Sequence, residues 1–192
     1  MNLAIQLTFA RILLAVVFIF FIHQPSIAAA VLAAVIFGAA ALTDYYDGFV
    51  ARKYNLENDL GKFMDPIADK ILVLSAFIVF VQMHLVKDWM LVLILTRELL
   101  ITGLRIFALT KKKVIAAEKA GKHKTVSQMA AIFIILGFVI FQRSAVALSA
   151  WSSGIELWWG IGIDLTMAVT VTLTLISGFS YLWTNRGLFQ NS

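Results

Sequence analysis

Residues 44–69 read DYYDGFVARKYNLENDLGKFMDPIAD, a polar stretch between two long apolar runs. One set of acidic and small residues in it recurs at i, i+3, i+4 and i+7, which is a single face of a helix: Asp44, Asp47, Gly48 and Ala51. A second set recurs every four residues and also shares a face: Gly61, Asp65 and Asp69. Because only a short connection separates the two sets, we predict antiparallel neighbouring helices whose acidic faces meet. Pro66 is tolerable in the second of these helices if it lies within about the first turn.

The composition around this stretch indicates a bilayer as the solvent. Of the 192 residues, 61% are hydrophobic and 14% are charged, which gives too little polar surface for a soluble domain of this length. Helices satisfy their own backbone groups in lipid, so we predict an all-α integral membrane protein with six transmembrane helices in a single domain, residues 1–192. Gln6, Thr8 and Arg11 interrupt the first apolar run and favour a short N-terminal interfacial segment. The runs lie at 3–22, 27–43, 67–86, 89–109, 126–141 and 157–183.

Charge placement predicts the orientation of these helices. Basic residues gather in the connections around 52–62 and 111–124 and in the C-terminal tail, whereas the opposite side carries Lys87 and Arg143. The positive-inside rule places the basic side in the cytoplasm, so we expect a multi-pass protein of the inner (cytoplasmic) membrane. The tryptophans of residues 151–159 are then expected as an outer aromatic belt, and Asp164 as a water-facing residue near the outer end of the last helix.

Four carboxylates on facing helices predict a metal site. Two unit charges ~5 Å apart at an effective dielectric of ~20 repel by roughly 3 kcal/mol. Divalent cations offset this repulsion, and oxygen ligands favour magnesium first, with manganese or calcium as alternatives; two ions about 4 Å apart would suit a phosphoryl transfer. The chain has no cysteine, which excludes thiolate ligands. The alternative is a set of unrelated helix-end acids that balance nearby lysines, and the register with three small residues argues against it.

The pattern Asp-x2-Asp-Gly-x2-Ala-Arg-x8-Gly-x3-Asp-x3-Asp, from Asp44 to Asp69, resembles the signature of the CDP-alcohol phosphatidyltransferases. The resemblance implies a six-helix membrane fold, a homodimer and a site that opens to the cytoplasm. It implies that Asp44, Asp47 and Asp65 are the main metal ligands, and that Asp69 is the general base and also lies near metal. It further implies a CDP site shaped by four residues: Gly48, Ala51, Arg52 and Gly61. A hydroxyl of an acceptor alcohol would attack a CDP-linked lipid and release CMP.

A second set of charges lies inside the fourth apolar run. Glu98, Thr102 and Arg105 recur at i, i+4 and i+7, on one face of a segment that must cross lipid. Ionisable groups there are costly and are functional candidates by default. A phosphate on the acceptor would account for an embedded Arg105, whereas topology accounts for part of the lysines that follow. The alternative is a structural ion pair between helices.

Residues 97–105, followed by 121–128, resemble the members of the family that use sn-glycerol 3-phosphate, the phosphatidylglycerophosphate synthases. This likeness implies five basic residues around the acceptor phosphate: Arg105, Lys122, Lys124, Arg97 and Lys119. Relatives often carry Asn-x-Pro-Asn near the N-terminus, where this chain has Asn2-Leu3-Ala4-Ile5, so the shape of the first helix stays open.

The expected substrates are CDP-diacylglycerol and glycerol 3-phosphate, with no nucleic-acid partner. Cardiolipin, phosphatidylserine or inositol-phosphate transfer stays open within the family. Outside it, an intramembrane prenyltransferase would place its acids on well-separated helices. A cation transporter would place them near the bilayer midplane.

Overall fold

A computed structural model describes the backbone of residues 3–54, 59–110 and 120–186, and the side chains of residues 9–43, 70–106 and 124–186. The described residues form six α-helices and no strand, one helix for each apolar run that the sequence contains. The helices are α1 (Leu3–His23), α2 (Ile27–Tyr54), α3 (Asp59–Gln82), α4 (Asp88–Thr110), α5 (Ala120–Ala147) and α6 (Ser153–Thr184). The all-helical prediction is therefore confirmed.

The helices extend beyond the apolar runs into the polar stretch, as the helical spacing of the acidic pattern predicted. The apolar runs end at residue 43 and resume at residue 67, but α2 continues to Tyr54 and α3 begins at Asp59. A helix propagates through its backbone hydrogen bonds and needs no apolar face, and Ala, Arg, Lys, Leu and Met in this stretch are good helix formers. Both halves of the acidic pattern therefore lie on long helices that extend beyond the apolar runs.

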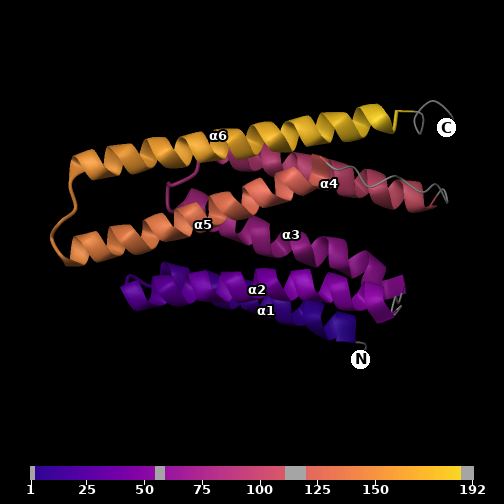
Figure 1. Cartoon of the computed structure of the whole chain (residues 1–192), viewed down its shortest axis with the longest axis horizontal. Coiled ribbons are helices and arrows are strands. Elements are labelled where there is room, and N and C mark those ends of the chain that lie inside the picture. Colours follow the sequence, from indigo (N-terminus) through magenta and orange to yellow (C-terminus); the bar gives the residue numbers. More distant parts are fainter. Residues whose placement is uncertain (1–2, 55–58, 111–119, 187–192) are drawn as a thin grey trace.

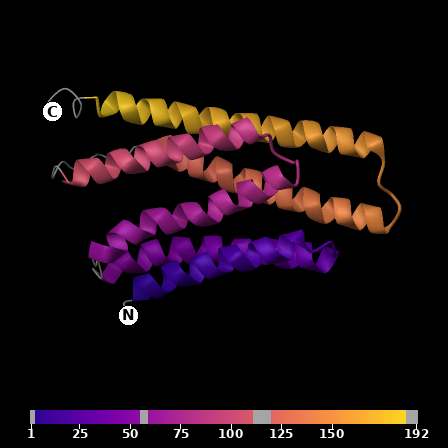
Figure 2. The same ribbon diagram turned by 180° about the vertical axis from the view of Figure 1, so that it is seen from behind.

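The helices form an elongated bundle with α1 and α2 on one side, α4 and α6 on the other, and α3 and α5 between them (Figure 1). Packing follows this order: α1 contacts α2 and α3, α6 contacts α4 and α5, and α3 also contacts α4 and α5. The C-terminal ends of α2, α4 and α6 lie at one end of the bundle with the start of α1 (Figures 1 and 2). We call this the connection end, and the opposite end, with turns at 24–26, 83–87 and 148–152, the turn end.

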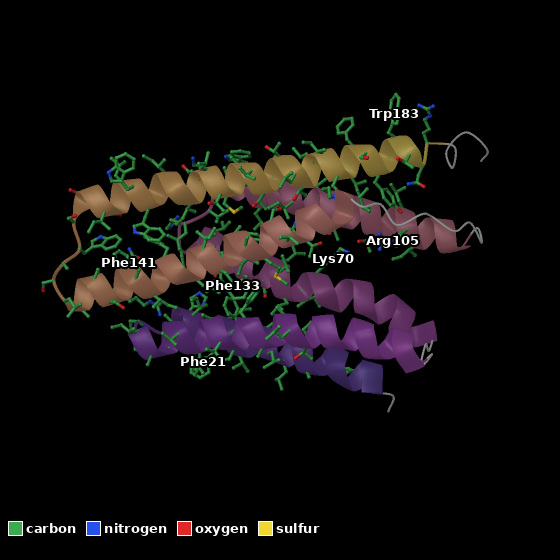
Figure 3. The ribbon with its side chains drawn as sticks, viewed as in Figure 1. Phe21, Lys70, Arg105, Phe133, Phe141 and Trp183 are labelled. Carbon is green, nitrogen blue, oxygen red and sulfur yellow. The ribbon has the colours of Figure 1, made fainter. Side chains whose placement is uncertain are left out.

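Small and aromatic residues build the core between α1, α2 and α5. Ala30, Ala33 and Ala40 of α2 are fully buried, and their small side chains let neighbouring helices approach closely. Phe37 of α2 packs against both α1 and α5. Its ring centroid lies 5.6 Å from that of Phe18 on α1 and 5.6 Å from that of Phe133 on α5. Figure 3 shows Phe133 pointing from α5 toward α2. Interdigitated aromatic rings of this kind fix the separation of the helices.

The outer surface of the bundle is apolar. Leu13, Leu165, Phe179 and Trp158 are 65%, 66%, 76% and 74% exposed. Water-soluble monomers rarely expose contiguous apolar surface on this scale, so lipid is the solvent that suits this face. Within the described part of the chain, two helices have an apolar stretch long enough to cross a bilayer by length and composition, Lys124–Ala147 in α5 and Ser153–Thr184 in α6. Among the residues with described side chains, shorter apolar stretches lie in α1, α2 and α3: Phe9–His23, Ile27–Thr43 and Lys70–Gln82.

Serine side chains cap the N-termini of two helices at the turn end. Ser26 Oγ accepts a hydrogen bond from the Ala29 N–H at 3.1 Å, and Ser152 Oγ accepts one from the Ile155 N–H at 3.4 Å. Each serine satisfies a backbone N–H that has no partner within its own helix. The starts of α2 and α6 are therefore fixed by the residue directly before each helix.

A residue with left-handed backbone conformation follows the end of α3 and the end of α5. His84 has φ 57° and Ser149 has φ 53°. Past each of them the next N–H donates back into the helix, from Leu85 to Phe80 O at 2.9 Å and from Ala150 to Ala145 O at 2.8 Å. Glycine is the usual residue in such a Schellman turn because other side chains are strained there.

Two basic side chains, Arg143 and Lys87, form contacts between elements at the turn end. Arg143 of α5 donates from Nη2 to Ile22 O at 2.6 Å and from Nη1 to Ser26 O at 3.2 Å, which joins α5 to the turn between α1 and α2. Lys87 Nζ donates to Asp164 Oδ2 at 2.7 Å, with the two side chains 55% and 47% exposed. Asp164 is thus half exposed, as expected for a water-facing residue, and also forms an ion pair.

The three tryptophans of residues 151–159 differ in their surroundings. Trp158 faces outward, whereas Trp151 and Trp159 pack against Phe138 and Phe141 with ring centroids 5.4–6.4 Å apart. Figure 3 shows Phe141 in the space between α5 and α6 near the turn end. Two members of the predicted belt therefore also fasten these helices together.

Candidate functional site

The acidic pattern lies on two helices that are in contact. Residues 44–52 belong to α2 and residues 61–69 belong to α3, so the spacing that was interpreted as helical is helical in the backbone. The two helices contact each other, and the end of α2 and the start of α3 lie together at the connection end (Figure 1). The side chains of both sets lie outside the described residues. The roles of the aspartates, and of Gly48, Ala51, Arg52 and Gly61, therefore stay predictions.

Pro66 lies beyond the first turn of its helix. A proline is tolerated most easily in about the first turn, but α3 begins at Asp59, which makes Pro66 the eighth residue. Proline lacks a backbone N–H, so the carbonyl of Lys62 loses its helical partner. The early start of α3 explains the difference, and it places Gly61, Asp65 and Asp69 together on one continuous helix.

A buried cluster of charged groups joins α3, α4 and α5. Glu98 of α4 is 6% exposed, and Lys124 of α5 forms an ion pair with its Oε1. Gln128 Nε2 donates to the same oxygen at 3.4 Å, and Lys70 Nζ of α3 lies 3.8 Å from Oε2. Arg97 Nη1 donates to Oε1 at 3.3 Å. A carboxylate buried this deeply needs such partners, and in return it fixes the direction of cationic groups from three helices.

Arg97 connects this cluster to α6. Its Nη2 donates to Ser177 Oγ at 2.8 Å, while Nη1 faces Glu98. Gly178 lies directly against the stem of the arginine, because a Cβ added at Gly178 would come within 2.9 Å of Arg97 Cγ. The guanidinium is therefore held between a carboxylate on its own helix and a hydroxyl on the last helix.

The five predicted acceptor-site residues have different surroundings. Arg105 is exposed on α4 near the connection end, where Figure 3 shows it beyond Lys70. Lys124 and Arg97 are held by Glu98. Lys122 lies on α5 with its side chain outside the described residues, and Lys119 lies outside the described residues altogether. The alternative interpretation of Glu98, an ion pair between helices, is what the structure shows, and it leaves the substrate role of Lys124 untested.

The sequence interpretation missed the polar side of α6. Four buried hydroxyl side chains lie on one face of this helix: Thr170, Thr174, Ser177 and Tyr181. Their spacing of i, i+4, i+7 and i+11 within an apolar run is a signal that was available in the sequence. Lys70, which follows the acidic pattern directly, was also missed as a partner of Glu98.

The donor set of the acidic pattern fits a divalent cation. Four carboxylates and no cysteine provide hard oxygen ligands, which magnesium and manganese accept. Among the side chains that the structure describes, no group of three histidines or acids lies close enough to share an ion. Asp44, Asp47, Asp65 and Asp69 are outside that set, so they are the candidates for a metal site in this chain.

Comparison with known proteins agrees with this arrangement. The family model described as CDP-alcohol phosphatidyltransferase matches residues 1–163. A Bacillus subtilis protein named CDP-diacylglycerol–glycerol-3-phosphate 3-phosphatidyltransferase is 37% identical over 204 residues, covering 100% of this chain and 98% of the relative. A Rickettsia typhi protein of the same name is 36% identical over 180 residues, covering 94% of each. A Mycobacterium tuberculosis protein named probable phosphatidylglycerophosphate synthase is 37% identical over 184 residues, covering 94% of this chain and 80% of the relative. The chain therefore belongs to the CDP-alcohol phosphatidyltransferase family, whose members are integral membrane enzymes.

Proposed function

We propose that this chain transfers a phosphatidyl group from CDP-diacylglycerol to sn-glycerol 3-phosphate, giving phosphatidylglycerophosphate and CMP. The observation that carries the proposal is the acidic pattern of residues 44–69, whose two halves lie on the contacting helices α2 and α3, in a chain whose relatives bear the name of this activity. The reaction would serve phosphatidylglycerol synthesis.

The donor half of the site consists of the acidic pattern and its small residues. Divalent metal would be held by the four aspartates Asp44, Asp47, Asp65 and Asp69. We propose that the metal is magnesium and that two ions bind. Bound there, the metal would neutralise charge on the donor diphosphate. The CDP moiety would lie against four residues: Gly48, Ala51, Arg52 and Gly61. Glycine and alanine leave room beside the backbone, and an arginine fork suits a phosphate oxygen.

The chemical step needs one base. The Asp69 carboxylate takes the proton of the acceptor hydroxyl, and that oxygen forms a new bond to the phosphorus that carries the diacylglycerol. The bond between this phosphorus and the bridging oxygen of CMP breaks, and CMP leaves with the bonding electron pair. Positioned base catalysis contributes about 10²–10⁴-fold to such a step.

The acceptor half consists of basic residues on α4 and α5, with Lys119 directly before α5 in the sequence. We assign the glycerol 3-phosphate dianion to five residues: Arg105, Lys122, Lys124, Arg97 and Lys119. The Glu98 carboxylate supports this role for two of them, because it fixes the directions of Lys124 and Arg97 within the bundle. The exposed Arg105 is available to a soluble ligand from the connection end.

The setting of the reaction follows from the charge pattern. We propose a multi-pass protein of the inner membrane, a single domain over residues 1–192 that acts as a homodimer, with the connection end facing the cytoplasm. The helix ends that flank the basic connections in the sequence lie on that side, which supports this orientation by the positive-inside rule. A lipid donor and a soluble acceptor can then meet at the membrane surface.

The test supplies purified protein with CDP-diacylglycerol and magnesium, and measures CMP release with each candidate alcohol in turn. Release that depends on glycerol 3-phosphate supports the proposal. Release only with phosphatidylglycerol, serine or an inositol phosphate would assign the chain to another acceptor. In the first case, Arg105→Ala should raise KM for glycerol 3-phosphate by roughly tenfold or more, because a charged contact to phosphate is lost. An unchanged KM would remove Arg105 from the acceptor site.

A further inference from the structure

The last helix carries a buried polar stripe that the proposed reaction does not yet use. Thr170, Thr174, Ser177 and Tyr181 are each at most 4% exposed and share one face with Gly178. Hydroxyls buried in an apolar bundle are costly unless they bond, so each bonded member of the stripe indicates a contact of value to the protein. The family match ends at residue 163, and the stripe lies beyond it.

Ser177 provides the most direct of these contacts. Its Oγ accepts a hydrogen bond of 2.8 Å from Arg97 Nη2 across the interface between α6 and α4. The neighbouring Nη1 of the same guanidinium donates to Glu98 Oε1 at 3.3 Å. Two acceptors on different helices thus define both the position and the plane of the guanidinium.

Gly178 makes room for the arginine stem. A Cβ at this position would lie 2.9 Å from Arg97 Cγ and 3.4 Å from its Nε. The first contact is shorter than real Cβ atoms tolerate, and Cγ is too near the backbone of α4 to move without a change of rotamer. Gly154, Gly160 and Gly162 of the same helix have nothing within 4 Å of such a Cβ. Glycine at 178 therefore has a local steric reason that the other three lack.

We propose that Ser177 and Gly178 are positioning residues for the acceptor phosphate. They hold Arg97 in one rotamer beside Glu98, and Glu98 in turn orients Lys124 and Gln128. This inference rests on the proposed function, because it assigns α6 a part in the acceptor site. A guanidinium fixed before the ligand arrives loses less side-chain entropy on binding, which lowers the KM for the acceptor.

The first experiment separates acceptor binding from other effects. Purified variants receive CDP-diacylglycerol, magnesium and glycerol 3-phosphate, and CMP release gives kcat and both KM values. Gly178→Ala should raise the KM for glycerol 3-phosphate about tenfold or more, since a displaced contact of about 1 Å is costly. Ser177→Ala should raise it about three- to tenfold, and Ser177→Thr, which keeps the hydroxyl, should restore it. The KM for CDP-diacylglycerol should change less than about twofold in each.

Two matched variants on α6 control for general damage to the helix. Gly162→Ala adds the same methyl group where nothing lies within 4 Å. Thr172→Ala removes a hydroxyl from the exposed side, where it donates to Ala168 O of its own helix. Both should leave every kinetic constant within about twofold of the wild type.

A double-mutant cycle tests whether the effect passes through Arg97. In an Arg97→Ala background, Ser177→Ala and Gly178→Ala should raise the acceptor KM no further, because the side chain that they position is gone. A full additional rise in that background would overturn the proposal, as would equal rises in both KM values or a fall in kcat alone. If Gly178→Ala does not fold, Ser177→Ala with its own cycle decides. Wild-type protein that is inactive with glycerol 3-phosphate but active with another alcohol would refute the proposed acceptor. An active wild type whose Ser177 and Gly178 variants keep the same acceptor KM would instead refute the positioning role alone.

Discussion

The two ends of the bundle hold their ion pairs in different ways. Toward the connection end, Glu98 and Lys124 have side chains 7% and 10% exposed, and Gln128 and Arg97 donate to the same carboxylate oxygen. At the turn end, Lys87 and Asp164 form a pair with 55% and 47% of their side chains exposed. Burial makes a charge depend on its partners, whereas water substitutes for a lost partner at the surface. The packing near the connection end therefore depends on its charged groups, whereas the packing at the turn end does not depend on the Lys87–Asp164 pair.

The largest expected effect is on turnover at the connection end. Asp69→Asn should reduce kcat by about 10²–10⁴-fold, because an amide does not take the proton of the acceptor hydroxyl. Binding of CDP-diacylglycerol should persist, which equilibrium binding in detergent can measure. The matched variant is Asp164→Asn at the turn end, which should leave kcat within about twofold of the wild type. Undiminished turnover in the Asp69 variant would remove this residue as the base.

Glu98→Ala should give the largest loss of stability. It deprives the buried Lys124 of the carboxylate that it contacts, at a cost of about 3–5 kcal/mol in the free energy of unfolding. Unfolding in micelles checks this value against Glu156→Ala, which removes an exposed acid from the first turn of α6 and should cost about 1 kcal/mol or less. Similar losses in the two variants would contradict the distinction between buried and exposed charge.

The connection end and the turn end also differ in what their arginines should affect. Arg143→Met removes hydrogen bonds to Ile22 O and Ser26 O, and should lower the free energy of unfolding by about 1.5–3 kcal/mol. The acceptor KM should stay within about twofold, since these contacts lie at the turn end. A large change in that KM without a loss of stability would show that the two ends are coupled.

The smallest effect is expected at the exposed ion pair. Lys87→Ala should change the free energy of unfolding by no more than about 1 kcal/mol. A double-mutant cycle with Asp164→Asn gives the coupling energy, and this energy should fall further at high salt because exposed charges are screened. A coupling as strong as that of Glu98 with Lys124 would break the comparison.

Much of this architecture was visible in the sequence, and the exceptions have physical causes. Six apolar runs predicted six helices because lipid leaves the backbone few other options. The helical spacing of the acidic pattern also predicted that both helices extend into the polar stretch, and α2 continues to Tyr54 while α3 begins at Asp59. Glu98 was recognised as unusual, but its partner Lys124 comes from another helix, and only packing shows which faces meet. The spacing of Ser177 with the other α6 hydroxyls was visible in the sequence, but its partner Arg97 lies on another helix, and Gly178 resembles an ordinary small residue of helix packing.

The reach of α2 has a consequence for the lipid substrate. Its apolar part, Ile27–Thr43, spans about 25 Å, close to the ~30 Å hydrocarbon thickness of a bilayer, and the helix then continues for about 16 Å to Tyr54. Asp44 and Asp47 follow directly after the apolar part. In the proposed orientation, the length of this apolar part places the acidic motif at the level of the lipid head groups, where the diphosphate of a lipid donor lies. A thicker or thinner bilayer would then shift the motif relative to its substrate, which makes membrane thickness a variable of the proposed reaction.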